Sequence, residues 1–232
     1  MKKSLGLLIV LLLIALMASQ LLLPRYFSYR LERALLAEAD FESLEVEAKS
    51  WPALLMLRGH FQSVDVKGEQ LDLAGLQIAT LEAELSNLYL DLGQLEQFRE
   101  LQAEQEFLKM VVTARDLENY LAAKIENIDN LRLRLGPPRE AVLRGDFPLL
   151  GTHLELKLAG NFELTAENSL VFHPGELMVG EMLVSEELVE QLREEVGFSL
   201  DLAKLALPIP LEMEEIRVEK DNLLILSGEE RY

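Results

Sequence analysis

The feature that most constrains the fold of this chain is an alternation of apolar and polar residues at every second position. The clearest example runs from Leu154 to Leu158 and reads LELKL. Similar runs occur at residues 64–67, 81–85, 131–135 and 215–219. Because successive side chains of a β-strand point to opposite faces, each run predicts a strand with one apolar face and one polar face.

Helix signals are fewer. Thr113 is placed to cap a helix that contains Asp116, and Ser185 is placed to cap another over residues 186–196. Residues 51–57 fit a helical turn or an edge strand, and residues 93–106 fit neither pattern clearly. We therefore expect an α+β fold in which a long, highly curved antiparallel sheet wraps one or two helices and leaves apolar strand surface to spare.

Composition narrows the class of protein. The chain has 232 residues, half of them hydrophobic, which is enough for one core in a single domain. It has no cysteine, so disulfides and thiolate chemistry are excluded. Five basic residues face three acidic ones in positions 1–40, so the net charge of −18 leaves −20 on the remainder. A domain this acidic repels nucleic acid, and none is expected as a partner.

The N-terminus carries an apolar stretch from Leu5 to Leu23, preceded by Lys2 and Lys3 and followed by Pro24. As a helix these 19 residues would span roughly 28 Å, close to the hydrocarbon thickness of a bilayer. The stretch is longer than the apolar region of most signal peptides and lacks an A-x-A cleavage site, which favours an uncleaved signal anchor over a signal peptide. The expected division is residues 1–24 as anchor or signal peptide, 25–40 as a connecting helix and 41–232 as one domain.

The likeness to export signals predicts a membrane-anchored domain on the extracytoplasmic side, in the cell envelope, or a secreted one if the leader is cleaved. The positive-inside rule does not fix this orientation, because Arg25, Arg30 and Arg33 follow the apolar stretch.

No pattern for catalysis or metal binding emerges. His60, His153 and His173 are scattered and form no H-x-x-x-H or H-E-x-x-H spacing. G-x-S-x-G, Walker A and dinucleotide-binding glycine motifs are absent. Adjacent carboxylates such as Glu186 and Glu187 fit a solvated helix surface better than an acid–base pair. We expect no enzyme activity, no cofactor and no metal.

Several short segments, taken in order, resemble the LmeA-like phospholipid-binding family, also described as the DUF2993 domain. The segments are GHFQSVDV (59–66) with Gly68, LSNLYLD (85–91), VTARDLENYL (112–121), GNF (160–162), VFHP (171–174), LALPIPL (205–211) and DN with LLILSG (221–228). The resemblance implies a fold similar to lipid-carrying tubular domains, phospholipid or a related amphiphile as partner, and no catalytic residues.

These observations predict a lipid-binding surface on the apolar strand faces. Its candidate residues are Val64, Val66, Leu131, Leu133, Leu154, Leu156, Leu158 and Phe162. Arg132 and Arg134, two apart on one strand and roughly 6 to 7 Å from each other, are the candidates for a lipid headgroup phosphate. The alternatives are that the apolar residues form an ordinary core and that the arginines pair with acidic neighbours. A further alternative function is an envelope scaffold, tethered to the membrane, whose apolar sheet surface docks another protein.

Overall fold

The structure is a computed structural model that describes residues 2–73, 75–92, 105–125, 128–149, 152–165, 169–185, 199–201 and 213–228. Its elements, in chain order, are α1 (Lys2–Glu38), β1 (Ser43–Lys49), the 3₁₀ turn η1 (Ala53–Arg58), β2 (His60–Leu73), β3 (Leu76–Tyr89), β4 (Gln105–Thr113), α2 (Ala114–Lys124), β5 (Asp129–Gly136), β6 (Glu140–Leu149), β7 (Thr152–Leu164), β8 (Ser169–Val179), β9 (Met182–Leu183), β10 (Ser199–Asp201), β11 (Glu215–Glu219) and β12 (Asn222–Ser227).

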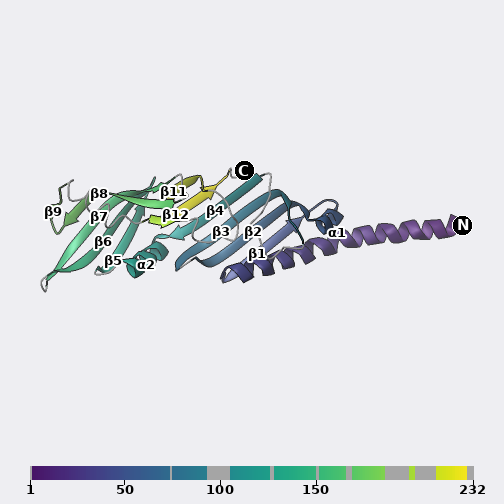
Figure 1. Cartoon of the computed structure of the whole chain (residues 1–232), viewed down its shortest axis with the longest axis horizontal. Coiled ribbons are helices and arrows are strands. Elements are labelled where there is room, and N and C mark those ends of the chain that lie inside the picture. The colour runs from purple at the N-terminus through teal and green to yellow at the C-terminus, as the bar shows by residue number, and fades with distance from the viewer. Residues whose placement is uncertain are drawn as a thin grey trace.

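The described strands form two antiparallel sheets. Sheet A has the order β1-β2-β3-β4-β12-β11, and sheet B has the order β10-β8-β7-β6-β5 with β9 added to β8. The sheets lie along the length of an elongated molecule, and α1 projects from the sheet A end (Figure 1). The predicted α+β class with mostly antiparallel strands is confirmed. The strands are divided between two sheets, and neither sheet is closed.

Helix α1 is continuous from Lys2 to Glu38 and contains Pro24. The helix continues through the proline, which removes one hydrogen bond at a cost of about 3 kcal/mol without necessarily ending a helix. Here the turns on both sides of the proline pack on the domain. Leu23 packs against the core, and Phe27 is buried in it.

The second half of α1 belongs to the core of sheet A. Phe27, Leu31 and Leu35 recur every fourth residue, so they lie on one face of the helix, and all three are buried. The Phe27 ring meets the Phe61 ring of β2 edge to face, with centroids 5.5 Å apart. The Ser28 hydroxyl accepts a hydrogen bond from the backbone N–H of Ala48 in β1. The helix therefore packs on the β1 and β2 side of sheet A.

In the first half of α1, the side chains that the structure describes from Gly6 to Met17, apart from residues 8 and 9, are exposed. We call this first half of the helix the free half of α1. Its exposed apolar side chains are Leu7, Val10, Leu11, Leu12, Leu13, Ile14, Leu16 and Met17. By length and composition the stretch Val10–Ala37 can cross a membrane, and a signal sequence near an N-terminus has the same properties.

Helix α2 joins the two sheets. It begins as predicted at Thr113, whose hydroxyl accepts the backbone N–H of Asp116 at 3.1 Å. Its buried residues are Leu117 and Leu121, and the helix contacts β3 and β4 of sheet A and β5 of sheet B. A backbone hydrogen bond from Val218 in β11 to Pro138, in the turn before β6, links the sheets a second time.

Two further segments, residues 51–57 and residues 186–196, were also assigned from the sequence. Residues 53–58, which overlap the stretch 51–57 that fitted a helical turn or an edge strand, form η1. The helix expected after Ser185, over residues 186–196, lies outside the described residues.

We expect Leu31→Ala to lower the free energy of unfolding by about 2 to 5 kcal/mol, because it removes a fully buried side chain from the contact between α1 and sheet A. Urea unfolding of the full chain in a mild detergent measures this. Leu36→Ala, at a position 42% exposed on the same helix, is the matched control and should change stability by less than about 0.5 kcal/mol. Equal effects of the two substitutions would contradict the docking of α1.

Candidate functional site

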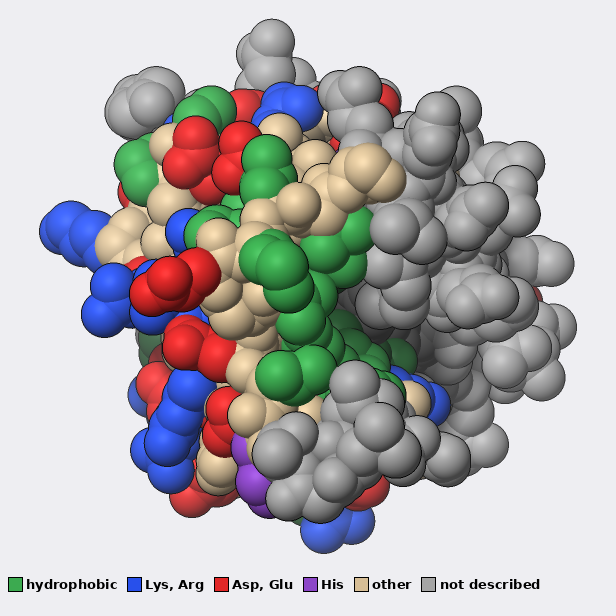
Figure 2. Space-filling model, turned by 90° about the vertical axis from the view of Figure 1, so that its left-hand side faces the viewer, with side chains coloured by type: hydrophobic (Ala, Val, Ile, Leu, Met, Phe, Trp, Pro, Cys, Tyr) green, Lys and Arg blue, Asp and Glu red, His purple; other side chains and the backbone are tan. Residues whose placement is uncertain are grey.

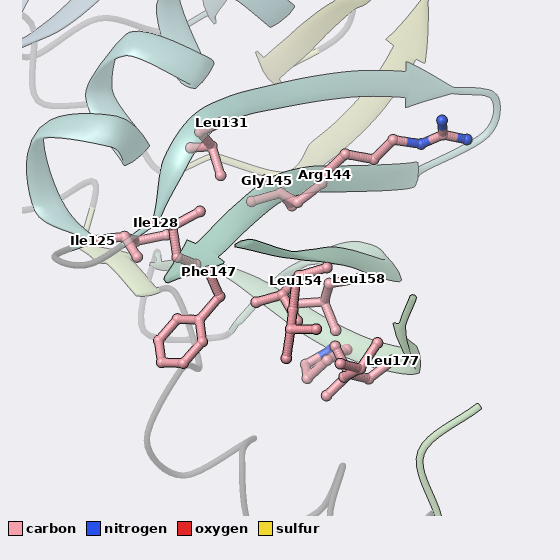
Figure 3. Close-up of a pocket in the computed structure, with 13 residues that line it drawn as sticks. Ile125, Ile128, Leu131, Arg144, Gly145, Phe147, Leu154, Leu158 and Leu177 are labelled. Carbon is pink, nitrogen blue, oxygen red and sulfur yellow. The ribbon is translucent and has the colours of Figure 1, made fainter. Parts of the chain in front are cut away.

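The candidate site is a cavity of about 390 Å³ on the apolar face of sheet B (Figure 3). Small-molecule sites have volumes of about 300 to 1,000 Å³ and are lined mainly by hydrophobic side chains. Its lining consists of Ile125, Ile128, Leu131, Leu143, Arg144, Gly145, Phe147, Leu154, Leu156, Leu158, Pro174, Leu177 and Val179. Almost all of the lining surface is apolar, so the cavity suits hydrocarbon.

The register of the strands places these side chains together. Leu158 pairs with Leu143 on one side and with Leu177 on the other. One row along, Leu156 pairs with Gly145 and Val179. Because directly paired residues point to the same face of a sheet, the rows build one continuous apolar wall from three strands.

The end of the cavity near α2 is lined by Ile125 and Ile128. Ile128 packs directly over Gly145, where an added Cβ would lie 2.3 Å from the isoleucine Cγ2. The missing side chain of Gly145 therefore makes room for this part of the wall.

Burial distinguishes this wall from the equivalent face of sheet A. In sheet A, Leu71, Leu81 and Leu108 are fully buried. In sheet B, Leu154, Leu156, Leu158, Leu177 and Val179 are only half-buried within the described part of the chain. Seen from the sheet B end, hydrophobic side chains form a band with charged side chains to one side (Figure 2).

Arg144 is the charged residue among the lining residues. Its guanidinium points away from Leu154, Leu158 and Leu177 (Figure 3). The polar face of β6 explains this direction, since Arg144 alternates with the inward Leu143 and Gly145. The cavity wall thus has no charged group directed into it among the described residues.

Four of the eight apolar residues predicted from the sequence line the cavity: Leu131, Leu154, Leu156 and Leu158. Leu133 and Phe162 are buried in sheet B outside the lining. Phe162 packs against Phe172, with ring centroids 5.4 Å apart.

Val64 and Val66 lie elsewhere, in β2 of sheet A. Both are buried, and they pair with Leu85 and Ala83 of β3. The structure therefore does not bring these two valines together with the residues of the cavity.

Arg132 and Arg134 lie on the exposed face of β5, opposite Leu131 and Leu133. The Arg132 guanidinium approaches Glu118 of α2 at 3.4 Å, and the other oxygen of Glu118 accepts the backbone N–H of Leu133 at 2.8 Å. Glu118 thus satisfies an N–H on the free edge of sheet B, which protects an edge that would otherwise be open to pairing.

Other basic residues lie beside Arg132 and Arg134 on this outer face. Arg132 pairs with Arg144 of β6, which pairs in turn with Lys157 of β7. The headgroup role of Arg132 and Arg134 remains a prediction.

The lining residues that the sequence did not mark as lipid-binding candidates are Ile125, Ile128, Leu143, Arg144, Gly145, Phe147, Pro174, Leu177 and Val179. Leu143 and Phe147 lie on one face of an expected strand, whereas residues 177–179 read LMV and show no alternation that selects a face. The missing information was the strand pairing, which brings β6, β7 and β8 side by side.

A second hollow, of about 340 Å³, lies over β1, β2 and β3 and is mainly polar. Glu45, Glu47, Glu82 and Glu84 give it an acidic character. At the end of β1 a hydrogen bond with Glu47 raises the pKa of Lys49, and Asp65 adds to the effect. No group of three or more histidine or acidic side chains suited to a metal ion occurs among the described residues.

A family comparison agrees with the apolar character of the cavity. The model of the family described as LmeA-like phospholipid-binding matches residues 18–227, which include both sheets and the second half of α1. The chain belongs to this family. No curated protein sequence and no solved structure matches the chain significantly. Membership in the LmeA-like family suggests lipid binding, a non-enzymatic role, and the apolar helix α1 is consistent with a membrane anchor or a signal sequence.

We expect Glu118→Ala to lower the free energy of unfolding by about 1 to 3 kcal/mol, because the N–H of Leu133 loses its partner in a partly buried place. Glu118→Gln keeps an acceptor oxygen and should recover most of the loss. Urea unfolding of both variants measures the difference, with Asn119→Ala at an exposed position of the same helix as the control. A glutamine variant as unstable as the alanine variant would count against the edge-capping role.

Proposed function

We propose that this protein binds phospholipid non-covalently, with an acyl chain lying in the cavity of sheet B, at the outer face of the membrane that α1 enters. The observation that carries the proposal is the apolar wall of half-buried leucines and valine on β7 and β8. Membership in the LmeA-like family supplies the ligand class.

The chemistry of the wall favours the hydrocarbon part of a lipid. Each methylene group that leaves water for an apolar surface gains about 0.8 kcal/mol, so an acyl chain gains with its length. A headgroup would lose hydration in the cavity without a described charged side chain to replace it, and is therefore expected outside it.

The competing function is a scaffold that docks a protein through its apolar sheet. A flat apolar patch that docks a protein would contain no cavity. The apolar face of sheet B contains one of about 390 Å³. This shape favours an elongated ligand over a protein surface.

The proposal predicts that a phospholipid carrying a photoreactive group in its acyl chain labels β7 and β8. The full chain is reconstituted in phosphatidylcholine vesicles that contain the probe, illuminated, digested and analysed by peptide mass spectrometry. Labelled peptides should cover Leu154–Leu158 and Leu177–Val179, in addition to any from α1. Labelling of α1 alone would overturn the cavity as the binding site.

We expect Leu156→Asp to reduce the labelling of β7 and β8 about tenfold or more, because a carboxylate in the wall must lose water when an acyl chain binds. Val142→Asp is the matched control, since Val142 alternates with the inward Ala141 and Leu143 and so faces the other side of sheet B. Labelling of α1 should be unchanged in both variants, and their circular dichroism should match that of the parent chain. A loss of labelling as large in Val142→Asp would show that the effect is not local to the cavity.

A further inference from the structure

The turn η1 carries exposed apolar side chains at the place where α1 leaves the domain. Ala53 and Met56 are completely buried, so the three-residue period of the 3₁₀ turn directs Leu54 and Leu57 outward. Trp51, just before the turn, is 71% exposed. We call Trp51, Leu54 and Leu57 the η1 patch.

The backbone that carries the η1 patch is held in a fixed conformation. Gly59 ends the turn with φ +78°, and an added Cβ there would lie 1.9 Å from the carbonyl oxygen of Leu90. The backbone N–H of Trp51 donates to the Gln62 side chain at 2.9 Å. Buried anchors and these hydrogen bonds hold the exposed side chains in place.

Gln20 of α1 ties the turn to the helix. Its amide nitrogen donates to the carbonyl of Ser50 at 3.0 Å, and its amide oxygen accepts the N–H of Ala53 at 2.9 Å. Figure 1 shows α1 continuing from this end of sheet A as a single straight projection. The depth at which η1 lies relative to a bilayer is therefore set by the depth of Gln20.

The charges at the ends of the apolar stretch define that depth. Lys3 and Arg25 are 22 residues apart, or about 33 Å along a helix, which matches a hydrocarbon core of about 30 Å. With these two residues at opposite surfaces, Gln20 lies about 7 to 8 Å inside the level of Arg25. The turn bonded to Gln20 is then held in the outer part of the hydrocarbon core, just below the headgroups.

The side chains of this region are those that the boundary with the headgroups favours. Tryptophan and tyrosine concentrate at membrane interfaces, and Tyr26 and Tyr29 are exposed on the following turns of α1. Leu21 and Leu22 are also exposed beside Gln20. Arg25 on α1 and Arg58 at the end of η1 are exposed, and their guanidinium groups suit anionic phosphates.

We infer that the η1 patch is a second membrane contact, which inserts into the lipid interface beside α1 and holds the domain against the bilayer. This rests on the proposed insertion of α1, and it is independent of the cavity in sheet B. Two points of contact, the helix and the turn, restrict the tilt of the domain more than a single helix with a free linker would.

Trp51 is the only tryptophan of the chain, so its fluorescence reports on the patch alone. The full chain is reconstituted in phosphatidylcholine vesicles with and without lipids brominated in the acyl chain near the headgroup. We expect the brominated lipid to remove most of the Trp51 emission, and aqueous iodide to quench it weakly.

The control places a tryptophan of equal exposure at the far end of the molecule. Met182 in β9 is 72% exposed, and β9 lies at the opposite end from the free half of α1 (Figure 1). In the double variant Trp51→Phe and Met182→Trp, we expect the emission to be quenched by iodide and unaffected by brominated lipid.

A second variant tests the patch without altering its probe. Leu54→Asp with Leu57→Asp changes exposed positions only, so the domain should keep its circular dichroism spectrum. We expect the quenching of Trp51 by brominated lipid to be lost while the chain still floats with the vesicles.

The outcomes separate this inference from the proposed function. A chain that floats with vesicles but whose Trp51 is quenched by iodide and not by brominated lipid would overturn the η1 contact and leave the anchor standing. A chain that does not float with vesicles would overturn the anchor and, with it, this contact. Neither result bears on the labelling of β7 and β8, which tests the cavity.

Discussion

The burial of the apolar face of each sheet is the constraint on which the rest of this structure depends. An apolar sheet face exposed to water costs about 25 cal/mol for each Å², so it must be covered by another element or by a ligand. In sheet A the second half of α1 covers the part formed by β1 and β2, through Phe27, Leu31 and Leu35. Helix α2 fills the junction between the sheets, and its buried Leu117 and Leu121 belong to the same core.

Sheet B has the same alternation of apolar and polar residues, but part of its apolar face is only half-buried. Its β7 and β8 side chains remain half-buried around a cavity within the described part of the chain. The proposed lipid tail completes the burial that a helix completes in sheet A. On this view the binding site is a part of the core that the chain leaves to its ligand, which explains why no catalytic or charged group is needed in the wall.

Particular residues show which structural features local sequence patterns can predict. Thr113 starts a helix as expected, because a cap depends only on residues within one turn. Pro24 does not end α1, because packing of the neighbouring turns on η1 and β1 offsets the loss of one hydrogen bond. Among the residues predicted to contact lipid, Leu131, Leu154, Leu156 and Leu158 line the cavity, whereas Val64 and Val66 obey the same alternation and lie in the core of sheet A. The alternation identifies the inward face of a strand. It does not tell which element or ligand covers that face.

The sequence by itself determined the secondary structure class, the apolar helix at the N-terminus and the resemblance to a phospholipid-binding family. These follow from the direction of successive side chains, from helix length and from short segments whose order along the chain is visible. Only the tertiary structure decided that the strands divide into two sheets, that α1 packs on one of them, and that β6, β7 and β8 face a cavity. The physical reason is that pairing and coverage join residues far apart in the chain, such as Leu143 with Leu158 and Leu177, and depend on how all the elements compete for the same apolar surface.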